Sequence, residues 1–363
     1  MVLTDFRCYH AAEVSFPSGV TVIRGDNGEG KTSLLEAIGW AATTRSFRGV
    51  PDAALVRSGR DAAVLRLDAE SDGRAQLIEA EIRAVGRNRV RINGQPVTKS
   101  RDAVGRLRVT VFAPDDLQLV KGSPSERRRY LDDLLAAAAP RYEGVRADFE
   151  KVLRQRNALL RQGAGGPHGA STLEVFDDQL ARTGAALVTG RLRLTAKLAP
   201  AVARAYEGLA GEGPLVTAVY EAEWADGSVP EDGEGVEQLL RAALVARRGQ
   251  ELARGVTVVG PHRDEWRLRL GDLDARAHAS QGEQRTLALG LRLAGHDVVA
   301  DAVGVDPVLL LDDVFSELDP DRSAALVTRL TSGQAIVTTA GALPPGIRSD
   351  GELVVAHGRV KPA

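Results

Sequence analysis

The chain has 363 residues, of which 26% are charged and 4% are aromatic, and its formal net charge is -2. This length allows one large α/β domain and a second lobe. The near-neutral charge excludes a globally basic nucleic-acid binder, so any such binding must come from local patches. The single cysteine, Cys8, excludes an intrachain disulfide and a cysteine-based zinc site. No apolar run is long enough to span a bilayer and no signal peptide opens the chain, so we expect a cytoplasmic protein without membrane contact.

A glycine-rich segment near the N-terminus has the pattern of a phosphate loop. Residues 20–23 predict a buried strand, residues 34–42 have apolar side chains at helical spacing, and residues 25–32 between them read G-D-N-G-E-G-K-T. In such loops the backbone N–H groups and the helix N-terminus hold phosphates. The lysine reaches the β- and γ-phosphates and also serves catalysis, while the threonine binds Mg²⁺. We therefore predict an ATP and Mg²⁺ site formed by Gly25, Asp26, Asn27, Gly28, Glu29, Gly30, Lys31, Thr32 and Ser33.

An acidic strand far downstream supplies the second half of this predicted site. Residues 308–311 are all apolar, and Asp312 and Asp313 follow them directly. Such a run is typical of a central parallel strand that is buried on both faces. Its carboxylates would then lie at the C-terminal edge of the sheet, where ligands bind in open α/β sheets. We expect Asp312 to hold Mg²⁺ and Asp313 to act as the general base on the attacking water.

Two further segments narrow the class of protein. Residues 280–285 read S-Q-G-E-Q-R ahead of an apolar run at helical spacing, and Ser316-Glu317-Leu318-Asp319 follows the acidic strand. Ser280 and Glu283 have the spacing of a capping box, which would explain them as a well-capped helix alone. The alternative interpretation is an anion site aimed at a phosphate that another phosphate loop holds.

Together these motifs resemble the ABC-type ATPase superfamily, and Glu283 in place of the usual glutamine is similar to its SMC and Rad50 branch. Within that branch the chain most closely resembles the RecF family of bacterial recombination mediators. The departures from the family pattern are Cys8, where asparagine is usual, and Thr339, where transporter ATPases have a switch histidine. The segments that carry the resemblance are Phe6-Arg7-Cys8-Tyr9, Gly25–Ser33, Ser46-Phe47-Arg48, Phe112–Leu117, Lys121–Pro124, Arg127–Asp132 and Gly260-Pro261-His262-Arg263-Asp264.

The resemblance implies an ATP-dependent homodimer with a head-to-tail arrangement. Ser280 and Gly282 of one subunit would contact the γ-phosphate bound at the partner's Lys31, and Glu283 would belong to the same nucleotide site. Gln118 resembles the glutamine that links the metal site to the helical lobe, both as a metal ligand and in catalysis. Further residues of the nucleotide site would be Asp319, which crosses the interface, together with Arg7 and Arg48. For His262-Arg263-Asp264, a role beside the nucleotide or in DNA coupling and a purely structural network remain equally open.

The pattern along the chain predicts an α/β fold: a P-loop ABC-type ATPase head with a mixed sheet and an antiparallel β layer (lobe I), and an inserted helical lobe II. We expect lobe I to contain residues 1–123 and 254–363, and lobe II to contain residues 124–253. Strands are predicted over 64–82 and 90–97, with a hairpin turn at Asn93-Gly94. Helices are predicted over 127–139, 142–160, 173–198 and 236–253, the third ending before Pro200, and no long heptad run indicates a coiled-coil arm.

Two locally basic segments are candidates for DNA binding. In a DNA-associated family, arginine contacts to phosphate would give little sequence specificity and a steep dependence on salt. Isolated segments of this kind are more often solvated surface. The first contains Arg83, Arg87, Arg89, Arg91, Lys99, Arg101, Arg106 and Arg108, and the second contains Arg182, Arg191, Arg193, Lys197 and Arg204.

The family resemblance implies a DNA repair and replication function. The homodimer would close on double-stranded and gapped DNA without sequence specificity, and weak DNA-stimulated hydrolysis of ATP to ADP and phosphate would reopen it. With RecO- and RecR-type partners, it would help to load a RecA-type recombinase during recombinational repair and the SOS response. The alternatives are a transporter ATPase subunit, a small-molecule kinase, and an ATP-gated DNA clamp whose turnover is incidental.

Overall fold

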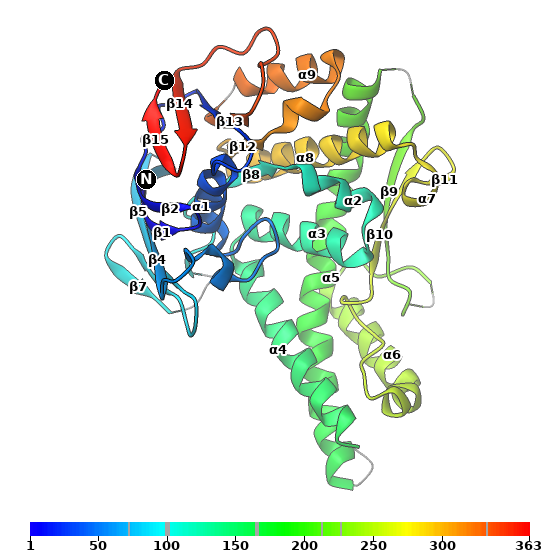
Figure 1. Ribbon diagram of the computed structural model, residues 1–363. Coiled ribbons are helices and arrows are strands. Elements are labelled where there is room, and N and C mark those ends of the chain that lie inside the picture. The colour runs from blue at the N-terminus through cyan, green and yellow to red at the C-terminus, as the bar shows by residue number, and fades with distance from the viewer. Residues whose placement is uncertain (72, 99–101, 164–166, 212, 226, 332) are drawn as a thin grey trace. The chain divides into compact units, whose positions relative to one another are not determined.

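The computed structural model describes residues 1–363 except 72, 99–101, 164–166, 212, 226 and 332. Contacts divide the chain into two compact units, whose elements are labelled in Figure 1. The first unit contains Met1–Leu117, Arg204–Gly213 and Arg285–Ala363, and the second contains Gln118–Ala203 and Pro214–Gln284. Both ends of the chain therefore build one unit, and most of the middle builds the other.

A mixed six-stranded sheet lies in the first unit. It consists of β3 (Val20–Arg24), β8 (Val109–Phe112), β12 (Val308–Asp312), β13 (Ala335–Thr339), β14 (Gly351–Ala356) and β15 (Arg359–Pro362). The strand order is β15-β14-β3-β13-β12-β8, and all neighbours are parallel except β14 and β15. The predicted buried strands β3 and β12 are confirmed, and both lie in the parallel part of the sheet, where apolar runs are covered on both faces.

A second, antiparallel sheet also belongs to the first unit. It consists of β1 (Val2–Phe6), β2 (Tyr9–Glu13), β4 (Ala62–Ser71), β5 (Arg74–Arg83), β6 (Arg89–Ile92) and β7 (Gln95–Val97), in the order β2-β1-β4-β5-β6-β7. Asn93 and Gly94 connect β6 to β7 with φ values of 51° and 78°, as a tight hairpin turn requires. The predicted hairpin is therefore confirmed.

Helix α1 (Lys31–Thr43) packs against both sheets of the first unit. It contacts β12 and β13 of the mixed sheet and β4 of the antiparallel sheet. Its side chains are consequently buried on nearly all sides, including Leu34, Leu35 and Trp40. Most of α8 (Gln281–Val303), together with α9 (Pro320–Val327), completes the helices of this unit.

The second unit is mainly helical. It contains α2 (Gln118–Lys121), α3 (Pro124–Ala138), α4 (Arg141–Arg161), most of α5 (Pro167–Ala210), α6 (Gly233–Arg254) and α7 (Ala275–His278). The helices predicted over 127–139, 142–160 and 236–253 are confirmed as α3, α4 and α6. Within the described ranges, none of the helices combines the length and the apolar composition that crossing a membrane requires.

The prediction that the third helix ends before Pro200 is wrong, because α5 continues through this residue to Ala210. A proline inside a helix removes one backbone hydrogen bond and costs about 3 kcal/mol. Leu198 and Val202 are fully buried on either side of it. Burial of such side chains at about 1.5–3 kcal/mol each offsets this loss.

A small sheet in the second unit was not predicted. It consists of β9 (Val216–Glu221), β10 (Glu265–Leu270) and β11 (Leu273–Asp274), in the order β11-β10-β9. β9 pairs with β10 along its whole length. Since β10 follows α6 in the sequence, the second unit continues beyond the end of α6. The contacts therefore group the chain differently from the expected boundaries at 123/124 and 253/254, since the second unit begins at Gln118 and ends at Gln284.

Candidate nucleotide site

The phosphate loop connects β3 to α1, and its shape depends on glycines with positive φ. Gly25, Gly28 and Gly30 have φ values of 156°, 88° and 114°. A Cβ atom at Gly25 would lie 2.3 Å from the carbonyl oxygen of Val355, and one at Gly30 would lie 2.5 Å from the Cys8 Sγ. The loop therefore needs glycine at these two positions, because its neighbours leave no space for a side chain.

Lys31 is the first residue of α1, and its ammonium group turns back onto the loop. The Nζ atom donates to the carbonyl oxygens of Gly25 at 2.6 Å and Asp26 at 2.9 Å. Lys31 is buried, so the ammonium is held inside the loop rather than in solvent. Phosphate oxygens are stronger acceptors than carbonyl groups for such a cation, so this position fits the predicted phosphate contact.

Asp312 joins the phosphate loop to the acidic strand. The hydroxyl groups of Thr32 and Thr338 donate to its Oδ1 atom, at 2.8 Å and 2.9 Å. Burial raises the pKa of the Asp312 carboxyl, while the two hydroxyl groups act in the opposite direction. A carboxylate beside a threonine hydroxyl supplies the oxygen ligands that Mg²⁺ prefers, so the donor set fits this ion. The two halves of the predicted site therefore meet, although they are far apart in the sequence.

Asp313 follows β12 in a left-handed conformation, with φ of 50°. Its N–H donates to the hydroxyl and carbonyl oxygens of Thr338, at 3.0 Å and 3.2 Å. Its Oδ1 atom is buried and has no hydrogen-bond partner among the described residues. Burying an acceptor without a hydrogen-bond partner costs free energy, so we expect a ligand or water to donate to this oxygen. A general base needs such an acceptor beside the attacking water. Sequence analysis missed Thr338 as a site residue. It is the penultimate residue of β13, the parallel neighbour of β12, and it pairs with Asp312 at the carboxyl edge of the sheet.

The two arginines of the predicted nucleotide site have different surroundings. The Arg7 guanidinium binds the buried Glu36 carboxylate through Nε at 2.8 Å and Nη2 at 2.7 Å, and the Ala54 carbonyl through Nη1 at 2.8 Å. All three nitrogens of Arg7 therefore have protein partners. Arg48 is exposed, and its positive charge is one of the influences that partly oppose the rise in the pKa of the Asp312 carboxyl that burial causes. Arg48 is thus the better placed of the two for a phosphate contact.

Asp319 and Gln118 stay predictions in the roles that the resemblance implies. Asp319 caps α9 by accepting from the Arg322 N–H at 2.9 Å, and its carboxylate also pairs with the Arg322 side chain at 2.8 Å. Its side chain is 45% exposed, so it remains accessible to a partner subunit. Gln118 begins α2 in the second unit.

The Ser280 segment forms the predicted capping box at the start of α8. The Ser280 N–H donates to the Glu283 carboxylate at 2.8 Å, and the Glu283 N–H donates to the Ser280 hydroxyl at 3.3 Å. The first of these bonds is the main cause that lowers the pKa of Glu283. Ser280 is exposed and Gly282 is half-buried, and their contact with a partner's γ-phosphate stays a prediction.

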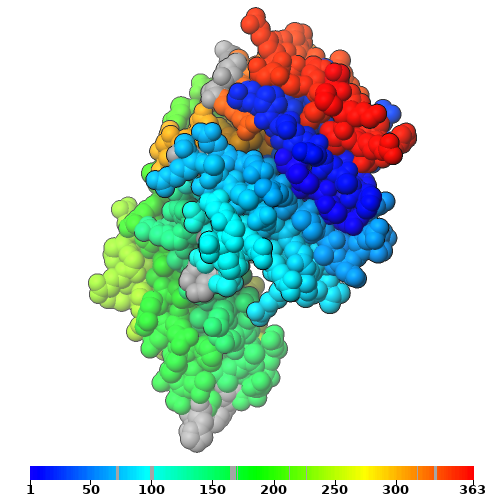
Figure 2. All heavy atoms as spheres, turned by 90° about the vertical axis from the view of Figure 1, so that its left-hand side faces the viewer, coloured from blue at the N-terminus to red at the C-terminus, as the bar shows by residue number. Residues whose placement is uncertain are grey.

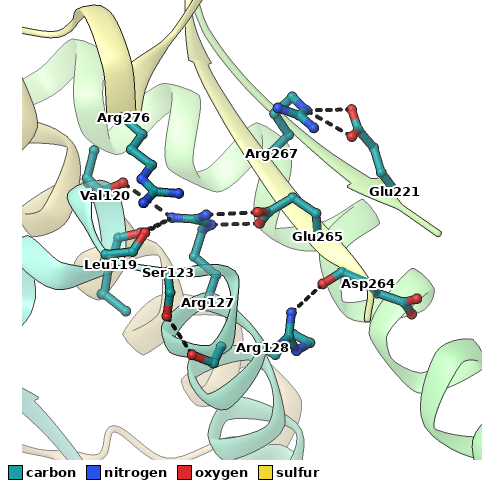
Figure 3. Close-up of polar contacts among 12 residues, drawn as sticks. Leu119, Val120, Ser123, Arg127, Arg128, Glu221, Asp264, Glu265, Arg267 and Arg276 are labelled. Carbon is teal, nitrogen blue, oxygen red and sulfur yellow. Dashed lines mark hydrogen bonds and ion pairs between the residues drawn. The ribbon is translucent and has the colours of Figure 1, made fainter. Parts of the chain in front are cut away.

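A polar cluster ties α2 to the strand that leads toward Ser280 (Figure 3). The Arg127 guanidinium binds both carboxylate oxygens of Glu265, at 2.8 Å and 2.9 Å. Its Nη1 donates to the carbonyl oxygens of Leu119 and Val120 in α2 and of Gly122, which follows this helix. α7, which precedes Ser280, contacts both α2 and β10. Sequence analysis identified Arg127 as a family residue without predicting this role.

The His262-Arg263-Asp264 segment belongs to a buried network of the second unit. The Asp264 carboxylate accepts hydrogen bonds from the Tyr220 hydroxyl and from the Trp224 Nε1 at 2.6 Å, and it is fully buried. Burial raises the pKa of Asp264 to about 6 and lowers the pKa of His262 to about 4. The geometry thus favours the structural interpretation for Asp264.

Some arginines of the predicted basic segments are exposed, whereas others form ion pairs within the protein. In the first segment Arg87 and Arg91 are exposed, whereas Arg83 binds Glu81 at 2.7 Å. Lys99 and Arg101 lie outside the described residues. In the second segment, the expectation that Arg191 contributes to a basic surface is wrong, because Arg191 is buried and binds both carboxylate oxygens of Asp132.

A phosphate loop after β3, paired aspartates at the end of β12 and a capped α8 define an ABC-type ATPase head. The family model described as the RecF/RecN/SMC N terminal domain matches residues 1–342. The chain belongs to the RecF family. It is 45% identical to the DNA replication and repair protein RecF of Streptomyces avermitilis, over 99% of this chain and 98% of that protein. The protein of the same name from Frankia alni is 44% identical, over 99% and 97% of the two chains.

Solved structures agree with the family and with the predicted fold class. A structure of the recombination mediator RecF with ATP, from the RecFOR pathway, superposes with a TM-score of 0.93 at 28% identity, over 100% of this chain and 96% of that chain. An SMC head domain from Pyrococcus furiosus gives a TM-score of 0.54 at 16% identity, over 100% and 94% of the two chains, which supports the fold alone. The transporter alternative is not favoured.

Proposed function

We propose that the chain is an ATP-gated, DNA-binding homodimer that acts in recombinational repair and replication. The names of its relatives support this role, since they are DNA replication and repair proteins, and the similar solved structures are described as a recombination mediator with ATP. The observation that carries the proposal is the 2.8 Å hydrogen bond from Thr32 to Asp312, which joins both halves of one ATPase site.

ATP would bind with its phosphates against the loop N–H groups and the Lys31 ammonium. Thr32 and Asp312 would hold Mg²⁺ together with Gln118, and the ion would neutralise charge on the β- and γ-phosphates. The buried Asp313 Oδ1, which has no hydrogen-bond partner among the described residues, would orient the attacking water and accept its proton. These contacts support weak hydrolysis, which DNA would stimulate.

The partner subunit would complete each site. Ser280, Gly282 and Glu283 of one subunit would meet the γ-phosphate held by the other, with Asp319 beside the interface. ATP would then stabilise the dimer, because the interface is complete only when nucleotide is bound. We infer that the closed dimer binds double-stranded and gapped DNA without sequence specificity. Proteins of the RecO and RecR type, and a RecA-type recombinase that is loaded at the gap, would be its partners.

Sedimentation of the purified protein with ADP and with ATP-Mg²⁺ tests this function. We expect a dimer only with ATP, and we expect Ser280→Arg to abolish it while nucleotide binding persists. Asp232→Arg is the matched control, because Asp232 caps α6 by accepting from the Gly235 N–H at 2.7 Å and lies outside the predicted interface. A monomer under every condition, with nucleotide bound, would overturn the proposal and favour a small-molecule kinase.

A further inference from the structure

The turn between β14 and β15 contacts the phosphate loop directly. The backbone N–H of His357 donates to the Glu29 carboxylate, and the His357 Nδ1 lies 3.7 Å from the Glu29 Oε1. The Glu29 side chain is 25% exposed, whereas the His357 side chain is 91% exposed. The backbone of the turn, rather than the imidazole, therefore makes the close contact with the loop.

Cys8, between β1 and β2, and Tyr9 of β2 also contact the loop. The Cys8 Sγ lies 3.8 Å from the Glu29 carbonyl oxygen, and the Tyr9 hydroxyl donates to the Gly30 carbonyl oxygen at 3.0 Å. A Cβ atom at Gly358 would lie 2.9 Å from the Cys8 carbonyl oxygen. Figure 2 shows the N-terminal strands in dark blue beside the C-terminal hairpin in red, and β2 contacts β15.

Each of these contacts is made to a hydrogen-bond acceptor of the phosphate loop. Two carbonyl oxygens and one carboxylate are held from outside, by Cys8, Tyr9 and His357. Holding the acceptors outward favours the conformation in which backbone N–H groups point toward a phosphate. Glycine-rich segments lose much conformational entropy on ordering, so external restraints reduce the cost of ordering the loop around a ligand.

We propose that the His357–Gly358 turn is a positioning element of the ATP site, which acts through Glu29 on the conformation of the phosphate loop. The turn does not touch the nucleotide itself. The inference rests on the ATP binding of the proposed function, but it does not depend on the dimer. It is tested with ADP and monomeric protein, so its failure and failure of the ATP-dependent dimer are distinguishable.

Gly358→Ala tests the inference through the turn, with Gly94→Ala as the matched control. Both glycines are second residues of hairpin turns, with φ values of 68° and 78°, but nothing lies within 4 Å of a Cβ at Gly94. Both substitutions therefore carry the same backbone strain, and only the first displaces the turn from Cys8. We expect Gly358→Ala to weaken the binding of a fluorescent ADP analogue roughly tenfold to a hundredfold, the equivalent of a lost charge-assisted hydrogen bond. Equal affinities of the two variants would overturn the inference.

Glu29 variants test the same contact from the loop. Glu29→Ala removes the acceptor and should weaken ADP binding, while Glu29→Gln keeps an acceptor oxygen and should restore most of the affinity. If both residues act through one contact, Glu29→Ala combined with Gly358→Ala should bind no more weakly than the weaker single variant. Additive losses would show that the turn acts independently of Glu29, which would contradict the proposal.

Discussion

At the scale of single residues, the surroundings of Asp313 fit the role of a general base. Its backbone is fixed by Thr338, while its buried Oδ1 atom has no hydrogen-bond partner among the described residues. We expect Asp313→Asn to bind ATP and form the ATP-dependent dimer, but to hydrolyse ATP about 10²–10⁴-fold more slowly, because an amide cannot accept the proton. Single-turnover hydrolysis, measured beside ATP affinity, checks this. Hydrolysis at the wild-type rate would exclude Asp313 as the base.

Asp264 and His262 should give opposing dependences of stability on pH. Burial raises the pKa of Asp264 from 3.8 to about 6, so the folded state holds its proton more tightly and the free energy of unfolding falls as pH rises through this interval. Burial lowers the pKa of His262 from 6.5 to about 4, so the unfolded state takes up its proton first, and stability is instead lost as pH falls. In the wild type the two slopes largely cancel.

Asp264→Asn should therefore expose the His262 slope. Relative to the wild type, we expect its free energy of unfolding to rise by about 2 kcal/mol between about pH 4 and pH 6, since one unit of pKa shift corresponds to about 1.4 kcal/mol. His262→Gln should change in the opposite direction. Urea unfolding at several pH values measures both variants, and curves parallel to the wild type would contradict this assignment.

At the scale of elements, Arg127 connects α2, α3 and β10. Its side chain is 6% exposed and that of Glu265 is 13% exposed. We expect Arg127→Ala to lower the free energy of unfolding by about 3 kcal/mol, because it leaves a nearly buried carboxylate and three carbonyl groups without their donor. Arg267→Ala is the control: Arg267 binds Glu221 on the neighbouring strand at 2.8 Å, but both side chains are 33% exposed (Figure 3).

The control should cost less than about 1 kcal/mol, as exposed ion pairs do. Chemical unfolding of both variants provides the comparison. If the two losses are equal, the Arg127 cluster contributes no more than an ordinary surface pair, and α2 must be held by other contacts.

The helices and strands show which features local sequence predicts and which it does not. The strand, phosphate loop and helix around Lys31 are specified by local pattern, and so is the capping box at Ser280, where two side chains satisfy the helix end. The pairing of β9 with β10 joins distant segments, so the local sequence does not reveal this sheet, although Val216, Val219 and Tyr220 favour a strand. The same limit applies to Pro200, where burial of the helix outweighs the local preference to end it. Thr338 was missed because only strand order brings it beside Asp312.

At the scale of the whole molecule, charge distribution decides how DNA could bind. A net charge of -2 gives no general attraction to phosphate, so local basic surface must supply it. The structure reduces this surface, because Arg191 is buried with Asp132 and Arg83 is paired with Glu81. Arg91 of β6 and Arg87, in the segment between β5 and β6, remain exposed. The exposed residues of the second segment are Arg182, Arg193, Lys197 and Arg204.

Loss of Arg87 and Arg91 should therefore weaken DNA binding in a way that depends on salt and not on sequence. Each phosphate contact releases counterions, so each substitution to alanine should reduce the slope of log affinity against log salt by about 0.9 on duplex DNA. Arg83→Ala is the control, since the charge of Arg83 is already paired with Glu81. Titrations of labelled duplexes with ATP-bound protein at several salt concentrations measure the slopes. An unchanged slope for Arg87→Ala and Arg91→Ala would place the DNA on a different surface, and a loss confined to one DNA sequence would indicate base contacts instead of phosphate contacts.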